Sequence, residues 1–223
     1  MSEEIVTIPF LGRPLRFIVN DQEPDSMILD EIIVLNRYQV FWPHLSNTTT
    51  VLDIGAHKGF FTVCAASTGA HVTAYEPNPV SCSVLIRNLK LNGLEADVHC
   101  GGVWDKNETR QFAVPQNSSG CAGTINADSA AYEHFDHFEA PCYAFNEIAA
   151  AKSWFFMKMD VEGAEVEIIN SASEPVLRSI LKFGMELHGR EESLIKKLAP
   201  IFHLESVLSH DTQQPSYLYG GLR

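Results

Sequence analysis

A turn after the apolar segment 51–54 holds residue types that could bind a nucleotide. Asp53, Gly55 and Gly59 lie in or beside this turn, an apolar helix is expected after it, and Glu76 follows the next apolar segment. Glycines let the backbone approach a ligand closely, and an acid after the second strand accepts hydrogen bonds from ribose hydroxyls. This spacing predicts a ligand with a ribose, bound across the carboxyl ends of parallel strands.

The spacing of the glycines narrows the choice of ligand. In the dinucleotide pattern G-x-G-x-x-G, the places of the second and third glycines are here taken by His57 and Phe60. The observed pattern D-x-G-x-x-x-G suits a ligand that has a ribose but no pyrophosphate, and S-adenosylmethionine is such a ligand. The residues expected to bind this cofactor are Asp53, Gly55, Ala56, His57, Gly59, Glu76, Pro77, Asn78, Val103, Trp104 and Asp160.

A second group of reactive side chains lies at the ends of two later apolar segments, 155–159 and 183–187. Asp160 falls at the carboxyl end of the first, which is the edge of an open α/β sheet where ligands bind. Glu186 and His188 lie on one side of the end of the second, because side chains two positions apart in a strand share a face. The residues expected to act in catalysis are Lys158, Asp160, Glu162, Glu186 and His188.

S-adenosylmethionine carries its methyl group on a sulfonium sulfur, and transfer of this group to an acceptor is an in-line displacement. The protein must therefore mainly align the acceptor with the methyl carbon. An alcohol acceptor must also lose a proton to a base. His188 is the first choice for this base because an unperturbed imidazole titrates near physiological pH. Asp160 and Glu162 could instead orient the acceptor or the cofactor. A structural role for His188 and a structural Lys158–Asp160 ion pair are open alternatives.

Metal binding is a further alternative for the same side chains. Oxygen and nitrogen donors are present on Asp160, Glu162, Glu186 and His188. A metal-free site uses these residues equally well, and no metal is predicted. His134 and His137 are not expected to bind a metal, because on a strand their rings would face opposite ways.

Short apolar segments alternate with helical ones along most of the chain, which favours a parallel sheet with helices on both faces. The segments expected as strands are 51–54, 71–75, 97–100, 155–159, 183–187, 202–209 and 216–222. Helices are expected over 60–67, 80–91, 165–171, 175–181 and 191–198. Glu165 and Glu167 fall in one of these helices, where one or both should be solvated or supply negative charge at the helix N-terminus.

The chain is expected to form one domain over residues 1–223. Residues 5–19 indicate a hairpin and 27–35 a helix, so that residues 1–46 would cover a Rossmann-like core made by 47–223. The alternation breaks over 103–146, which we interpret as an insertion or lid region. Within it, the small polar segment 116–124 is the candidate lid.

The composition restricts the partners. The formal net charge is −12 at pH 7, from 16 basic and 28 acidic residues. Such a surface repels phosphate groups, so neither nucleic acid nor an anionic membrane is expected as a partner, and a small-molecule acceptor is. The five cysteines form no paired motif, which favours reduced thiols. With an acidic N-terminus and no long apolar stretch, we expect a cytoplasmic protein. The oligomeric state stays open, with a homodimer as one alternative.

The chain resembles the FkbM-type S-adenosylmethionine-dependent methyltransferases over about residues 38–188. The resemblance rests on 51–59 (VLDIGAHKG), 75–79 (YEPNP), 88–93 (NLKLNG) and, most specifically, 158–165 (KMDVEGAE). It implies an α/β, Rossmann-like class I methyltransferase fold with a seven-stranded, mostly parallel sheet whose last strand is antiparallel. It also implies methyl transfer, most often to oxygen, with sugars and polyketides among the acceptors. His57 and Lys58 depart from the family, which often has Asn and an aliphatic residue there.

These observations predict an S-adenosylmethionine-dependent O-methyltransferase that acts on a hydroxyl of a small acceptor, as in natural product biosynthesis. An N-methyltransferase acting on a peptide or amine is the main alternative. An RNA or DNA methyltransferase is disfavoured by the net charge and by the lack of an Asn/Asp-Pro-Pro-Tyr/Phe signature after the fourth strand. A non-catalytic cofactor-binding protein conflicts with the intact acidic motifs, and a dehydrogenase conflicts with the failed dinucleotide pattern.

Overall fold

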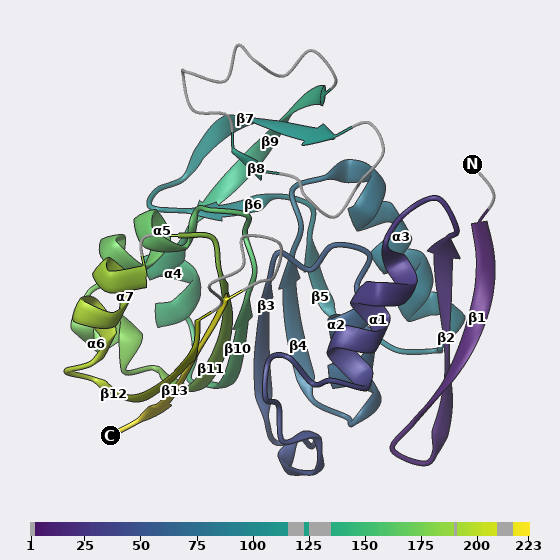
Figure 1. Ribbon diagram of the computed structural model, residues 1–223, viewed down its shortest axis with the longest axis horizontal. Helices are drawn as coiled ribbons and strands as arrows, with labels where there is room; N and C mark the ends of the chain where they lie inside the picture. The colour runs from purple at the N-terminus through teal and green to yellow at the C-terminus, as the bar shows by residue number, and fades with distance from the viewer. Residues whose placement is uncertain (1–2, 116–122, 125–134, 190, 209–215) are drawn as a thin grey trace.

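The computed structural model describes residues 3–115, 123–124, 135–189, 191–208 and 216–223, and its centre is a seven-stranded sheet (Figure 1). The strand order is β12-β13-β11-β10-β3-β4-β5. β13 runs antiparallel to both of its neighbours, and the other pairs are parallel. The bounds are β3 Thr50–Ile54, β4 His71–Tyr75, β5 Asp97–His99, β10 Trp154–Met159, β11 Ile180–Leu187, β12 Phe202–Val207 and β13 Ser216–Leu222. The predicted sheet and its antiparallel last strand are confirmed.

The inner strands are apolar because helices cover both faces of the sheet. Figure 1 shows α1 (Asp25–Ile33), α2 (Phe60–Ser67) and α3 (Pro79–Leu91) on one side, and α4 (Phe145–Ala150), α5 (Glu165–Ser171), α6 (Glu174–Leu177) and α7 (Glu191–Leu198) on the other. Each side has its own hydrophobic cluster, with Phe61 and Leu85 in the first and Ile169 and Leu194 in the second. None of the helices in the described ranges is long and apolar enough to cross a membrane.

The N-terminal segment packs beside α2 and α3. Strands β1 (Glu3–Phe10) and β2 (Arg13–Asn20) form an antiparallel hairpin, α1 follows, and a short 3-10 helix, η1 (Trp42–His44), precedes β3. Phe17 of the hairpin meets Phe60 of α2 edge to face, with 5.6 Å between the ring centroids. The N-terminal segment is therefore packed against α2, the helix that follows the turn from Gly55 to Gly59 (the glycine turn).

Region 103–146 contributes most of a second, four-stranded sheet with the order β6-β9-β7-β8. Figure 1 shows it above the upper end of the central sheet. Its strands are β6 Gly102–Trp104, β7 Glu108–Pro115, β8 Gly123–Thr124 and β9 Phe135–Ala144. The sequence indicated an excursion here but not its strands, because β7 and β9 mix polar and apolar residues without strict alternation. The candidate lid 116–124, apart from β8, lies outside the described residues, as does His134.

The predicted helix 175–181 is wrong in its second half. Helix α6 ends at Leu177, and Ile180 and Leu181 begin β11. Ile180 is buried and pairs with Trp154 of β10, so the apolar end of this run enters the sheet. A short apolar run is consistent with either element until its neighbours are known.

The expectation of five reduced cysteines is also wrong. Cys82 on α3 and Cys100 after β5 form a disulfide, while Cys64 and Cys142 are free and buried. Cys121 lies outside the described residues. The two bonded cysteines are 18 positions apart in sequence and become neighbours only because α3 packs beside the end of β5. The bond joins the start of α3 to the turn that leads into the second sheet.

Replacing Cys100 with serine should lower the free energy of unfolding by about 3 kcal/mol. The reason is that the disulfide closes a loop and so reduces the conformational entropy of the unfolded chain. Urea unfolding with and without dithiothreitol measures this. The reductant should destabilise the native protein to the same extent and leave Cys100→Ser unchanged. Unfolding of the native protein that is insensitive to the reductant would contradict the prediction.

Candidate active site

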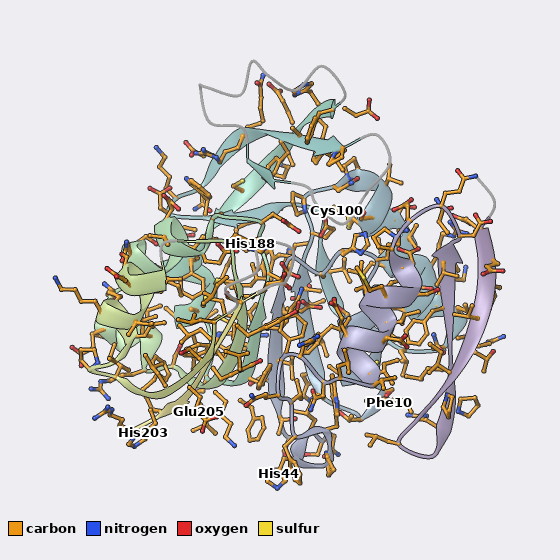
Figure 2. All side chains as sticks on the ribbon, in the orientation of Figure 1. Phe10, His44, Cys100, His188, His203 and Glu205 are labelled. Atoms are coloured by element: carbon orange, nitrogen blue, oxygen red, sulfur yellow. A yellow bond between two sulfur atoms is a disulfide. The ribbon has the colours of Figure 1, made fainter. Side chains whose placement is uncertain are left out.

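The candidate active site is a cavity of about 240 Å³ at the carboxyl ends of β3, β4, β10 and β11. Helix α1 adds Met27 and Glu31 to its wall, and the second sheet adds Phe112. Ten of the predicted site residues line it: Gly55, Ala56, His57, Glu76, Pro77, Val103, Lys158, Asp160, Glu162 and Glu186. The other five, which do not line it, are Asp53, Gly59, Asn78, Trp104 and His188. In Figure 2, His188 and Cys100 both lie toward the upper end of the central strands.

The glycine turn brings the backbone of β3 against the end of β10. Gly55 has φ +76°, and a Cβ at this position would lie 1.7 Å from the carbonyl oxygen of Asp160. Gly59 has φ +77° and starts α2, where a Cβ would lie 2.5 Å from Cγ of Leu85. Both positions therefore require glycine for space as well as for conformation.

Asp53 and Lys158 form a buried ion pair beside this turn. Asp53 is fully buried; it accepts a hydrogen bond from Thr62 Oγ1 at 2.5 Å and lies 3.5 Å from Lys158 Nζ. Lys158 also donates to the carbonyl of Gly55. Burial opposes the charge on Lys158, but the carboxylates of Asp53 and Asp160 outweigh it and raise the pKa of the amine. Lys158 is thus a charged anchor for the turn, and it has no free pair to act as a base.

Glu76 is a buried carboxylate at the rim of the cavity. Its Oε2 accepts the backbone N–H of His57 at 2.7 Å, and its Oε1 accepts that of Asn78 at 2.8 Å. Each carboxylate oxygen has a second lone pair, so two fixed acceptors remain for a ligand. Burial, only partly offset by these hydrogen bonds, raises the pKa of Glu76 to about 7. Asn78 itself caps α3, with its side chain accepting from Val80 N at 2.9 Å.

The side chain of Lys58 points from the turn to the N-terminal segment. Its Nζ lies 2.6 Å from Asp25 Oδ2 and 3.1 Å from Glu23 Oε2, and it is only 5% exposed. Its carbonyl accepts Nδ2 of Asn88 at 2.9 Å. Lys58, at a position where the family often has an aliphatic residue, therefore links α1 to the glycine turn.

Three glutamates surround His188 at the ends of β10 and β11. Its Nδ1 lies 2.8 Å from Glu165 Oε1, and its Nε2 lies 3.4 Å from Glu162 Oε2 and 3.7 Å from Glu186 Oε1. Glu165 is 1% exposed, so it is not solvated, and it supplies negative charge in the first turn of α5. Asp160 lies beside this group and accepts a hydrogen bond from Tyr38 Oη at 2.8 Å.

The electrostatics of this group change the assignment of the base. Burial opposes the imidazolium, but the hydrogen bond with Glu165 and the charges of Glu165, Glu162 and Asp160 outweigh it and raise the pKa of His188 to about 10. Burial and the nearby Asp160 raise the pKa of Glu162 and of Glu186, although His188 acts in the opposite direction. The raised pKa favours the protonated form of His188 at neutral pH, which disfavours its predicted role as the base and leaves the ionised forms of the two glutamates as candidate proton acceptors.

Trp104 lies apart from the cavity. The guanidinium of Arg110 stacks over its ring in a cation–π contact, with 4.0 Å between Cζ and the ring centroid. Its neighbour Val103 does line the cavity. Of the two residues predicted after the third strand, Val103 is the one that could contact a ligand.

Two groups of side chains in the described residues have donor atoms close enough together to hold a metal ion. One consists of Glu23, Asp25 and His57, where the ammonium of Lys58 already binds both carboxylates. The other consists of Asp160, Glu186 and His188, where the imidazolium lies against the carboxylates. The absence of a metal stays a prediction.

Tyr38, Glu31 and Phe112 are parts of the wall that were not predicted from the sequence, and the contact of Glu165 with His188 was not predicted either. Tyr38, Glu31 and Phe112 come from the N-terminal segment and the second sheet, whose contacts with the cavity are tertiary. A signal existed only for Glu165, which belongs to the motif 158–165.

The chain was compared with known proteins. The methyltransferase FkbM domain model matches residues 53–211. No curated protein matches the chain in sequence.

Among solved structures, the chain is similar to the T. thermophilus 16S rRNA N2 G1207 methyltransferase in complex with AdoMet and guanosine (15% identity, 99% of this chain and 51% of that chain, TM-score 0.53). It is also similar to an rRNA methylase from Streptococcus thermophilus (10%, 92% and 99%, TM-score 0.51). A third is a Pyrococcus abyssi tRNA (uracil-54, C5)-methyltransferase in complex with S-adenosyl-L-homocysteine (10%, 100% and 45%, TM-score 0.50). The chain spans about half of the first and third proteins. At these low identities, the structural similarity confirms the Rossmann-like methyltransferase fold and does not identify the acceptor.

Proposed function

The chain belongs to the FkbM methyltransferase domain family, and we propose that it transfers the methyl group of S-adenosylmethionine to a hydroxyl of a small-molecule acceptor. The observation that carries this proposal is one cavity whose two ends are lined by different kinds of residue. At one end, Gly55 and the fixed carboxylate of Glu76 suit a ribose-bearing ligand. At the other, Glu162 and Glu186 provide carboxylates for an acceptor.

The residues present fit the cofactor. Gly55 leaves its backbone free of a side chain, Glu76 keeps two acceptor lone pairs, and Pro77 and Val103 add apolar walls. When bound, S-adenosylmethionine supplies an electrophilic methyl group on a positively charged sulfur. Asp160 lies against the glycine turn and lines the same cavity, so its side chain adds negative charge that suits a cationic cofactor.

A hydroxyl acceptor needs a base, and the glutamates supply one. The raised pKa of Glu162 and of Glu186 makes each a stronger base than an exposed glutamate. His188, held by the buried Glu165, stays a fixed cation beside them. We therefore assign proton abstraction to this carboxylate pair and charge compensation to His188.

A small acceptor fits the charge of the protein better than a nucleic acid does. The net charge of −12 and the carboxylates around the cavity repel phosphate groups. A role in natural product biosynthesis belongs to the same proposal. The Cys82–Cys100 disulfide favours an oxidising compartment over the cytoplasmic location expected from the sequence.

Methyl-¹³C-labelled S-adenosylmethionine tests the proposal. The protein is incubated with the label and either a small-molecule extract of its source cells or their total RNA. An O-methyl resonance in the small-molecule fraction is expected. An N-methyl resonance there would assign an amine acceptor instead, and label in the RNA alone would overturn the small-molecule proposal.

Binding of S-adenosylhomocysteine should weaken about tenfold in total between about pH 8 and about pH 6. The pKa of Glu76 is raised to about 7, so its carboxyl is mostly ionised at the higher pH and mostly protonated at the lower. A protonated carboxyl has lost acceptor capacity for ribose hydroxyls, and binding then requires release of the proton. Calorimetry at both pH values measures the effect. Glu76→Gln should bind weakly at both, and an unchanged pH dependence in this variant would contradict the assignment.

A further inference from the structure

Tyr38 reaches the candidate active site from outside the residues that the family model matches. It lies between α1 and η1, is 6% exposed, and lines the cavity. Its hydroxyl donates to Oδ2 of Asp160 at 2.8 Å, across 122 positions of sequence. Its ring lies 5.4 Å from Nζ of Lys158, measured to the centroid. Tyr38 therefore contacts two of the predicted catalytic residues at once.

The backbone of Tyr38 packs closely against strand β11. Gly184 lies inside β11, where a Cβ would come within 2.4 Å of the carbonyl oxygen of Tyr38. A glycine weakens a strand interior, and such a position is often one where another backbone approaches closely. The preceding carbonyl, that of Arg37, accepts a hydrogen bond from the hydroxyl of Tyr219 at 2.6 Å. Two strands of the central sheet thus hold this segment by its main chain.

The ring of Tyr38 is fixed as firmly. It meets Phe61 of α2 and Tyr217 of β13 edge to face, with centroid distances of 5.8 and 6.0 Å. Burial and the adjacent Asp160 carboxylate keep the pKa of Tyr38 well above its ordinary value. The hydroxyl accordingly stays protonated and can only donate to Asp160.

Asp160 needs such a partner because its surroundings are crowded with like charge. Glu162 and Glu186 line the same cavity, while Lys158 Nζ is 3.8 Å away and shared with Asp53 and Gly55. A carboxylate in this position would turn toward Lys158 or solvent unless one of its oxygens were held. The hydroxyl of Tyr38 holds Oδ2.

We propose that Tyr38 is a positioning residue that orients Asp160 toward the ammonium group at the amino-acid end of the cofactor, so that the N-terminal segment completes the active site. The inference rests on the proposed function, since it takes S-adenosylmethionine as the ligand. Asp160 is suited to this contact because its backbone lies directly against the Gly55 turn, with Asp160 N bonded to Ile54 O at 3.0 Å.

A double-mutant cycle on cofactor binding tests the proposal. The affinity for S-adenosylhomocysteine is measured by calorimetry in the native protein, Tyr38→Phe, Asp160→Asn and the double variant. Tyr38→Phe should weaken binding about 3- to 10-fold, which is the range of one hydrogen bond, without a change in melting temperature beyond a few degrees. In the Asp160→Asn background, Tyr38→Phe should weaken binding no further, because its effect passes through Asp160.

Gly184→Ala provides a second route to the same result. The added methyl group would displace the carbonyl of Tyr38 while leaving Tyr38 and Asp160 unaltered in type. Where this variant folds, it should weaken binding at least as much as Tyr38→Phe. Unchanged affinity in Tyr38→Phe, or equal weakening in both backgrounds, would overturn the positioning role. A native protein that does not bind S-adenosylhomocysteine at all would overturn the proposed function itself, which separates the two failures.

Discussion

Replacing both Glu162 and Glu186 with glutamine will lower the rate of methyl transfer by about 10²–10⁴-fold, the usual contribution of a positioned base. Glutamine keeps the shape of glutamate but cannot take the proton of a hydroxyl. Burial and Asp160 raise the pKa of both carboxyls, which strengthens each as a base in its ionised form and lowers the fraction that is ionised at neutral pH. The turnover number with the acceptor identified by methyl labelling measures the effect.

The control is Glu174→Gln, which removes an acidic side chain from the exposed surface of α6, where its side chain is 62% exposed. It should retain the native rate. The double variant should also bind S-adenosylhomocysteine with affinity within a few-fold of the native protein, because the two glutamates lie on the acceptor side. A rate in the double variant equal to that of Glu174→Gln would show that neither carboxylate is the base.

Gly55→Ala will lower the free energy of unfolding by about 4 kcal/mol or more and abolish cofactor binding. The new Cβ would lie 1.7 Å from the Asp160 carbonyl oxygen, which is a backbone atom and cannot rotate away. Relief requires β3 and β10 to separate at the point where the cofactor turn begins. Urea unfolding and calorimetric titration with S-adenosylhomocysteine measure the two effects.

Gly12→Ala is the matched control. Gly12 also has a positive φ, +79°, but a Cβ there would meet nothing within 4 Å. This variant therefore carries only the conformational cost of alanine at positive φ, about 1–2 kcal/mol, and should bind the cofactor normally. If Gly55→Ala were as stable as Gly12→Ala and still bound S-adenosylhomocysteine, the close approach at the turn would have no part in the site.

The inner strands of the central sheet could be predicted because they are buried on both faces and bounded by turn residues. The predicted ranges 71–75 and 216–222 equal β4 and β13. The start of β11 was missed because Ile180 and Leu181 lie four positions after Val176 and Leu177, a spacing that also fits a helix. The strands β7 and β9 of the second sheet were missed because they mix polar and apolar residues without strict alternation. Pattern reasoning was thus most reliable where burial is symmetric.

The cofactor side of the site could be predicted further than the acceptor side. Glu76 and the glycine turn lie in consecutive segments, so local order in the sequence fixes their proximity. The role of His188 depends instead on Glu165, which is 23 positions away and packs against its ring. Tyr38 reaches Asp160 across 122 positions. Such contacts leave no periodic signal in a single sequence, and neither does the pairing of Cys82 with Cys100.

The most direct measurement is a calorimetric titration of S-adenosylmethionine, S-adenosylhomocysteine and NAD into the native protein and into Glu76→Ala. We expect that the first two ligands bind the native protein, that NAD does not, and that Glu76→Ala loses most of the affinity, because the acceptors for the ribose hydroxyls are gone. Binding of NAD alone, or equal affinity of both proteins for S-adenosylhomocysteine, would contradict the assignment of this cavity to the cofactor.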